Sequence, residues 1–285
     1  MLLKMFGGKK PIIRFSLPEI ALKAQDLVGK LSISGIQPKL SVKFDKKLGE
    51  LVPAAEGGEY ILKPQPQAFP HLPENEQCCM DIAQVLGIDV PQHCLLALTD
   101  GNFAYVVKRF DRHDTEKIHQ EDFSQILGQD KYDGSVEQIG RKLKEVSSVP
   151  GLDVQLFFER VVLNFLLGNG DAHLKNYSIN YHQDKWIRLS PAYDIVSSKL
   201  AIPDEKEESA LAINGRKNRI SREDFDTVAQ YLQIPIKVRY EKFIDQVDRI
   251  KALINASRLD PQEQKRFNSI VKDRYQRMDL KGSLL

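Results

Sequence analysis

Residues 166–178 read LLGNGDAHLKNYS, and the organisation of the whole chain is best understood from this stretch. Before it, residues 154–167 (VQLFFERVVLNFLL) carry apolar side chains too densely for a helix with a solvated face, which predicts a central helix packed on several sides. After it, residues 177–181 alternate with the period of a strand. The polar loop between these two elements holds Asp171 and Asn176, which form the first candidate site.

The spacing of Asp171 and Asn176, D-x-x-x-x-N, is that of a kinase catalytic loop. In such a loop the acid accepts the proton of the substrate hydroxyl, and the amide oxygen holds Mg²⁺. Asp and Asn are also common in short polar loops because both tolerate turns. The spacing alone leaves a catalytic loop and an ordinary turn both open.

Composition excludes several broad classes of protein. The chain has 285 residues, enough for two domains, and its 41 basic and 39 acidic side chains leave a net charge of only +2, so no basic field points to nucleic acid. No apolar run reaches the length of a membrane span or a signal peptide, so we expect a cytoplasmic protein without a membrane partner. Cys78, Cys79 and Cys94 have spacing unlike a disulfide framework or a zinc pair, and we expect buried free thiols.

The hydrophobic pattern predicts an α+β fold with two lobes, residues 1–107 and 108–285. The first lobe is β-rich: helices are expected at 19–30 and 74–86, and strands at 40–44, 48–53, 59–63, 94–99 and 102–108. The second lobe is helical, with helices expected at about 121–128, 135–147, 153–168, 222–232, 236–256 and 260–278. The longest irregular polar segment, 197–218, is expected to be mobile.

The β-rich lobe contains a small-residue turn before its first strand. Ser32, Ser34 and Gly35 could expose backbone N–H groups to a phosphate, with Lys39 adding a positive charge. The alternative is an ordinary hairpin corner.

Lys63 and Glu76 form a second candidate pair in this lobe. Lys63 ends a predicted strand, as the phosphate-binding lysine of kinases does, although its ammonium could equally extend to solvent. Glu76 could meet Lys63 from the helix at 74–86, or could be an exposed acid of the first turn favoured by the helix dipole.

A second acid follows a predicted hairpin of residues 177–181 and 186–189. The hairpin returns the chain toward the loop of Asp171 and Asn176, so we expect Asp194 to lie near that loop. There its carboxylate could bind the Mg²⁺ that bridges nucleotide phosphates. Capping of a following helix is the alternative.

Seven motifs in order carry a resemblance to a known family: SISGIQPKLSV, YILKP, ENEQCCM, VVKRFDR, HQEDFSQILG, GDAHLKNYS and SPAYDI. From about Ser32 to Ser198 the chain resembles the HipA family of bacterial toxin-antitoxin kinases. The resemblance implies a protein-kinase-like fold and a serine/threonine protein kinase that uses ATP and Mg²⁺. It also implies a protein substrate, an aminoacyl-tRNA synthetase, and a DNA-binding antitoxin of the HipB type, with DNA contacted only through that antitoxin.

The resemblance also implies residue roles. Asp171 would be the catalytic base, with His173 and Lys175 ordering its loop or touching the transferred phosphate; Asn176 and Asp194 would hold Mg²⁺. The remaining candidates would bind ATP: Ser34, Gly35, Lys39, Lys63 and Glu76 around the phosphates, and Val107, Lys108 and Phe110 at the adenine-binding hinge.

Two features of the sequence depart from the full-length pattern of the family. Only a short stretch precedes Ser32, which resembles the short HipT type, and this type implies a separate small HipS-like partner. The Ser-Ile-Ser-Gly loop matches the HipT-type loop that is autophosphorylated, so Ser32 and Ser34 are candidate phosphorylation sites. Two other functions stay open: a small-molecule kinase of the aminoglycoside-phosphotransferase type, and a non-catalytic module that binds nucleic acid or an antitoxin through basic stretches such as Gly215–Arg219.

Overall fold

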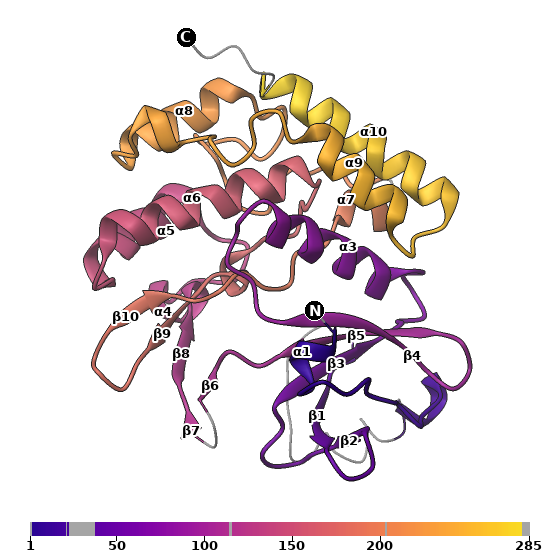
Figure 1. Ribbon diagram of the computed structural model, residues 1–285. Helices are drawn as coiled ribbons and strands as arrows, with labels where there is room; N and C mark the ends of the chain where they lie inside the picture. Colours follow the sequence, from indigo (N-terminus) through magenta and orange to yellow (C-terminus); the bar gives the residue numbers. More distant parts are fainter. Residues whose placement is uncertain (1, 21, 23–37, 114–115, 203, 281–285) are drawn as a thin grey trace. The chain divides into compact units, whose positions relative to one another are not determined.

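The computed structural model describes residues 2–20, 22, 38–113, 116–202 and 204–280 (Figure 1). The chain forms two compact units: Met1–Gln77 with Pro91–Lys117, and Cys78–Val90 with Ile118–Leu285. This division differs from a single boundary at 107/108 because helix α3 (Leu72–Val85) contributes to both units. The buried side chains of its second half, such as Ile82, belong to the second unit. The functions assigned to the two predicted lobes stay predictions.

The first unit is built on a five-stranded antiparallel sheet with the order β2-β1-β3-β5-β4. Its strands are β1 (Leu40–Asp45), β2 (Glu50–Pro53), β3 (Tyr60–Pro64), β4 (His93–Ala97) and β5 (Phe103–Lys108). All five predicted strands are therefore present. A short helix, α1 (Leu2–Met5), precedes the sheet, and most of the helix predicted at 19–30 lies outside the described residues.

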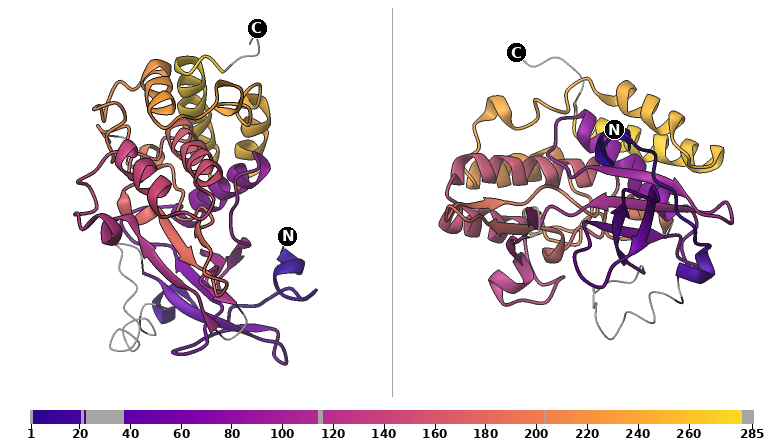
Figure 2. Two further views of the ribbon diagram at one scale, coloured as in Figure 1. Left: turned by 90° about the vertical axis from the view of Figure 1, so that its left-hand side faces the viewer. Right: turned by 60° about the horizontal axis from the view of Figure 1, so that its bottom comes forward.

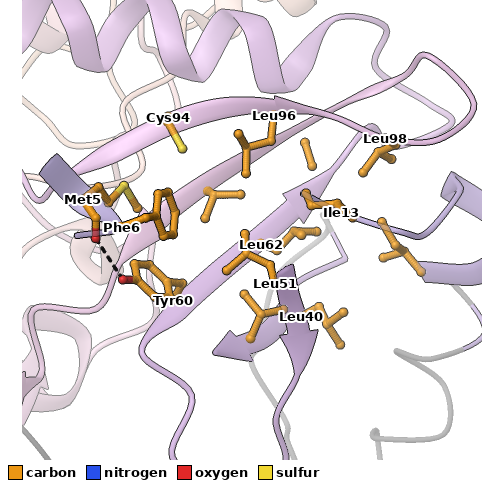
Figure 3. Close-up of a cluster of buried hydrophobic side chains, with 14 residues drawn as sticks. Met5, Phe6, Ile13, Leu40, Leu51, Tyr60, Leu62, Cys94, Leu96 and Leu98 are labelled. Atoms are coloured by element: carbon orange, nitrogen blue, oxygen red, sulfur yellow. Dashed lines mark hydrogen bonds between the residues drawn. The ribbon is translucent and has the colours of Figure 1, made fainter. Parts of the chain in front are cut away.

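Apolar side chains from this sheet and from the N-terminal segment form one core (Figure 3). The Phe6 ring lies 5.0 Å from that of Tyr60, and the Tyr60 hydroxyl donates to the Met5 carbonyl at 3.1 Å. Leu62 of β3 and Leu96 of β4 are buried in the same cluster. The N-terminal segment is thus tied to the sheet by both packing and a buried hydrogen bond. A two-stranded ribbon that the sequence did not predict, β6 (Arg112–His113) with β7 (Glu116–Lys117), follows β5.

The second unit has helices over a small sheet. Helices α5 (Val136–Val146) and α6 (Pro150–Leu166) lie between α8 (Arg222–Tyr231), α9 (Val247–Ala256) and α10 (Pro261–Arg277) on one side and the strands on the other (Figures 1 and 2). The sheet has the order β10-β9-β8. The remaining elements are β8 (His119–Asp122), α4 (Phe123–Leu127), the 3₁₀ turn η1 (Leu174–Asn176), β9 (Ser178–Tyr181), β10 (Ile187–Leu189), α7 (Ser198–Ala201) and the 3₁₀ turn η2 (Ile236–Val238).

Two predicted helices of this unit differ in the structure. The helix predicted from residue 121 begins at Phe123, because residues 119–122 pair with β9 instead. The helix predicted at 236–256 is broken: η2 is followed by turns, and Asp245 has a left-handed φ of 59°. A non-glycine residue rarely takes this conformation inside a helix, and the Asp245 N–H donates to the Leu280 carbonyl at 3.1 Å instead of continuing one.

Two predictions of composition can be compared with the structure. Cys78, Cys79 and Cys94 are buried free thiols, as expected. Among the described helices, none has the length and apolarity needed to cross a membrane.

Candidate active site

The loop of Asp171 begins at a tight turn after α6. The apolar sequence of α6 buries Phe157, Phe158 and Phe165, as predicted for a central helix. Gly168 then takes a left-handed φ of 68°, and a Cβ there would come within 2.9 Å of the Ile270 side chain on α10. Only glycine meets both demands without strain or displacement, so the direction of the loop is fixed where it leaves the helix.

A chain of buried amides then holds the start of the loop. The Asn164 side chain donates to the Tyr177 hydroxyl at 3.0 Å, and the Asn169 side chain donates to Asn164 Oδ1 at 3.0 Å. The Asp171 backbone N–H donates in turn to Asn169 Oδ1 at 3.3 Å. Burial raises the pKa of Tyr177 to about 12, so its hydroxyl stays protonated. The backbone of Asp171 is thereby tied to the interior of the unit.

The predicted metal ligands are in direct contact. Asn176 Nδ2 donates to Asp194 Oδ2 at 3.2 Å, and Asn176 Oδ1 accepts the His173 backbone N–H at 3.0 Å. The predicted hairpin of β9 and β10 is formed, with Ile179 opposite Leu189, and it returns the chain to this point. Asp194 therefore lies beside the loop of Asn176, as the sequence predicts.

Asp194 sits on a strained turn rather than at a helix cap. Its φ is 58°, a conformation that costs energy for a residue other than glycine and that clusters at functional sites. The N-cap of the following helix, α7, is Ser197, so the alternative role of Asp194 as a helix cap is excluded. The neighbouring Tyr193 hydroxyl donates to the Lys175 carbonyl at 2.9 Å, which joins this turn to the Asp171 loop.

Asp171 itself is exposed, as a group that must meet a substrate should be. His173 is partly buried, and burial lowers its pKa although the charges of Asp171 and Asp194 oppose this. The Lys175 side chain is exposed. The structure thus gathers Asp171, His173, Asn176 and Asp194 around one loop, and the catalytic roles given to them stay predictions.

Tyr132 is a neighbour of the site that the sequence did not reveal. It lies between α4 and α5, and its hydroxyl donates to Asp171 Oδ1 at 2.9 Å. The residues around it, KYDG, have the composition of an ordinary turn. Because Tyr132 precedes Asp171 by 39 positions, no local spacing could have linked the two.

The segment 197–218, which was expected to be mobile, is linked to α10 by ion pairs of Glu208. The Glu208 carboxylate accepts hydrogen bonds from Arg277 at 2.8 Å and from the Ile220 N–H at 3.0 Å, and Arg274 is 2.9 Å away. The Arg274 guanidinium also lies 4.5 Å from the centre of the Phe165 ring on α6. Residues 209–211 are buried, so this part of the segment packs into the unit, whereas residues 206–207 and 214–216 are exposed.

The first unit contains the other predicted pair. Lys63 Nζ and Glu76 Oε1 are 2.5 Å apart, and the two side chains are only 6% and 1% exposed. The predicted contact is confirmed, and this burial excludes both alternatives, a lysine extended to solvent and an exposed first-turn acid. The Lys63 ammonium also lies 5.6 Å from the centre of the Tyr105 ring.

The other predicted ATP-binding residues are partly described. Val107 is buried in β5, where it pairs with both β3 and β4, while Lys108 is exposed and Phe110 partly buried. Lys39 is partly exposed just before β1. Ser32, Ser34 and Gly35 lie outside the described residues.

The donor set at Asn176 and Asp194 fits Mg²⁺. The ion prefers hard oxygen ligands, which a carboxylate and an amide carbonyl supply. The His173 N–H occupies one lone pair of Asn176 Oδ1, and a carbonyl oxygen has a second. Asn176 and Asp194 would therefore hold the ion, and Asp171 would remain for proton transfer.

Comparison with protein families gives a match to the HipA-like C-terminal domain over residues 31–254. The chain belongs to the HipA-like family. It is 35% identical over 251 residues to Y4dM of Sinorhizobium fredii, whose kinase assignment is provisional, and 36% identical over 203 residues to a provisionally assigned kinase of Haemophilus influenzae. These alignments cover 80% and 66% of this chain but only 60% and 58% of the relatives, so the chain spans less than two thirds of their length.

The chain is also similar to a protein named as a toxin. The serine/threonine-protein kinase toxin HipA of Shewanella oneidensis is 28% identical over 210 residues, covering 65% of this chain and 47% of the toxin. The solved complex of Shewanella oneidensis HipA with HipB and operator DNA matches with a TM-score of 0.72 and 23% identity, covering 88% of this chain and 66% of that one. The Helicobacter pylori proinflammatory kinase CtkA matches with a TM-score of 0.62 and 17% identity, covering 88% and 92%. The fold is therefore the predicted α+β, protein-kinase-like fold.

Proposed function

We propose that this chain is an ATP-dependent serine/threonine protein kinase of the HipA toxin type. The observation that carries the proposal is the direct contact between the Asn176 amide and the Asp194 carboxylate, next to the exposed carboxylate of Asp171. An amide and two acids in this arrangement supply both a metal site and a proton acceptor. A non-catalytic module has no need for either group.

In this proposal each group has one task. Asp171 accepts the proton of the substrate hydroxyl while the hydroxyl oxygen attacks the γ-phosphorus of ATP. Mg²⁺, when bound, would neutralise charge on the nucleotide phosphates. Lys63, held by Glu76, binds phosphate oxygens in the first unit. His173 and Lys175 order the loop or contact the transferred phosphate, and Val107, Lys108 and Phe110 form the adenine site.

The resemblance to the HipA family supports a proposal for the substrate and the partners. The proposed substrate is an aminoacyl-tRNA synthetase. The proposed inhibitor is a DNA-binding antitoxin of the HipB type, because Shewanella oneidensis HipA was solved with HipB and operator DNA. The Ser-Ile-Ser-Gly sequence supports a HipT-type chain that autophosphorylates on Ser32 or Ser34 and has a HipS-like partner.

Labelled ATP and a panel of purified aminoacyl-tRNA synthetases test this proposal. We expect Mg²⁺-dependent transfer of label to one synthetase, and mass spectrometry of the same reaction should find phosphate on Ser32 or Ser34. An Asp171→Asn protein is the matched control, because it keeps the shape of the side chain and removes its charge. Transfer of label by that variant at the wild-type rate would contradict the proposal.

Asp194→Asn tests the metal site separately. We expect MgATP affinity to fall by about 10-fold or more, because the change removes the anionic ligand of a hard cation. Titration calorimetry of both proteins with MgATP, and with ATP in EDTA, measures the effect. If the variant and the wild type show the same difference in affinity between MgATP and ATP in EDTA, Asp194 does not bind the metal ion.

A further inference from the structure

The Tyr132 hydroxyl is the one hydrogen-bond donor that reaches the Asp171 carboxylate within the described part of the chain, at 2.9 Å from Oδ1. Tyr132 is 42% exposed, so it lies at the surface of the site rather than in the core. A carboxylate has two oxygens and about four lone-pair directions. One oxygen of the base is thus occupied by a neutral donor, and the other remains for a substrate.

The backbone around Tyr132 is fixed to the Asp171 loop. The Leu174 N–H donates to the Lys131 carbonyl at 3.0 Å, and a Cβ on Gly134 would come within 2.9 Å of the Leu174 side chain. The Ala212 N–H donates to the Gly134 carbonyl at 3.2 Å. Two segments distant in sequence therefore hold the turn that presents Tyr132.

The ring of Tyr132 is oriented as well as its backbone. It meets the His173 ring edge to face, with centroids 5.4 Å apart, and the Lys131 ammonium lies 4.5 Å from the ring centre. Both of these contacts are made with the ring. The hydroxyl can therefore be removed without removing the packing.

We propose that Tyr132 is a positioning residue for phosphoryl transfer: its hydroxyl holds Asp171 Oδ1 so that Oδ2 faces the substrate hydroxyl. This inference rests on the proposed function. In the step, the substrate O–H proton passes to Asp171 Oδ2, the substrate oxygen bonds to the γ-phosphorus, and the bond from that phosphorus to the ADP oxygen breaks. Tyr132 keeps its own proton throughout.

The environment of Tyr132 favours the protonated form of its hydroxyl. Burial and the neighbouring Asp171 carboxylate raise the pKa of Tyr132 above its usual value, against the opposing influence of Lys131. A protonated phenol at neutral pH can donate to the carboxylate in every step.

Tyr132→Phe tests the proposal because it removes only the hydroxyl. We expect kcat to fall by about 10- to 100-fold, the value of one hydrogen bond to a charged group, with the KM for MgATP and for the protein substrate unchanged. The thermal midpoint should stay at the wild-type value. Tyr231→Phe, which removes a hydroxyl from an exposed tyrosine at the end of α8, is the matched control and should keep the wild-type kcat.

Three results would overturn the assignment: an unchanged kcat in Tyr132→Phe, an effect confined to KM, or phosphate on Tyr132 in the mass spectrum, since a phosphorylated oxygen cannot donate.

The contact between Tyr132 and Asp171 can also be measured without phosphoryl transfer. Ultraviolet titration should show Tyr132 ionising at lower pH in Asp171→Ala than in the wild type, with Tyr132→Phe identifying the signal. Phosphoryl transfer by the wild type tests the proposed function. The ratio of kcat in Tyr132→Phe to kcat in the wild type tests the role of Tyr132, so failure of one proposal can be distinguished from failure of the other.

Discussion

Two aspartates near opposite ends of helix α6 differ in burial and in the number of hydrogen bonds that their carboxylates accept. Asp153, in the first turn of α6, is fully buried and accepts hydrogen bonds from Ser147 Oγ at 2.6 Å, from the Leu189 N–H at 2.9 Å and from Arg188 at 2.9 Å. Asp171, just past the other end, is exposed and accepts one from Tyr132. A carboxylate whose two oxygens are both occupied by hydrogen bonds serves to hold the fold together. A carboxylate with one unoccupied oxygen can accept a proton from a substrate.

The comparison also separates stability from activity. The bonds of Asp153 join the start of α6 to β10, so they contribute to the free energy of unfolding. Asp171 is held through its backbone, and its side chain contributes little to folding. Substitution of each residue should therefore damage a different property.

The largest effect is expected for Asp171→Asn. Phosphoryl transfer should fall by about 10²- to 10⁴-fold, the usual contribution of a general base, because the amide cannot take up the substrate proton. The thermal midpoint should match that of the wild type. The transfer rate and the thermal midpoint are measured on one preparation of the variant. A transfer rate within twofold of the wild type would contradict the catalytic role that distinguishes Asp171 from Asp153.

Asp153→Ala should show the reverse pattern. The unfolding free energy should fall by about 1–3 kcal/mol, because the buried Leu189 N–H loses its acceptor. Arg188, whose side chain is 30% exposed, also loses its ion-pair partner. Urea unfolding followed by the fluorescence of Trp186, the single tryptophan, reports on this part of the unit. Asp248→Ala, which removes an acid that is 90% exposed on α9, is the control and should change stability by less than about 0.5 kcal/mol. Equal losses in the two variants would contradict the role of Asp153.

Glu208 is intermediate in burial between Asp153 and Asp171, and its substitution should have the smallest effect of the three. Burial disfavours its charge, but hydrogen bonds from Arg277 and the Ile220 N–H, and the charge of Arg274, outweigh this and hold the pKa of Glu208 below 4.5. Because the folded pKa is the lower one, its stabilisation is complete above pH 4.5 and is lost as the pH falls through the folded pKa.

The variant that tests this is Glu208→Gln. Its thermal midpoint should lie a few degrees below the wild type at pH 7, and the gap should close as the pH falls well below 4.5. Melting curves across this range measure the gap. A gap that persists at the lowest pH would show that shape rather than charge is responsible.

Residues linked by local sequence were predictable, and those linked by tertiary structure were not. Asp171 and Asn176 share one loop, and the hairpin of β9 and β10 brings Asp194 back to it, so the proximity of these residues could be predicted from the sequence. Lys63 and Glu76 followed from the end of a strand and the face of a helix.

The missed features each depend on a distant partner. Tyr132 and Asp171 are 39 positions apart, and Glu208 and Arg277 are 69 apart. The polar segment around Glu208 has the composition of a solvated loop, and only the arginines of α10 show why it is held. Asp153 looked like any acid in the first turn of a helix until Arg188 supplied its partner.

The packing of Gly168 against Ile270 has a consequence for biosynthesis. The turn that launches the Asp171 loop is completed by a helix that is made roughly a hundred residues later, which takes several seconds at about 5–20 residues per second. Until α10 has left the ribosome, the nascent chain lacks both the side chain that seats Gly168 and the arginine that covers Phe165. The turn at Gly168 can therefore complete its packing only after the residues of α10 have been synthesised.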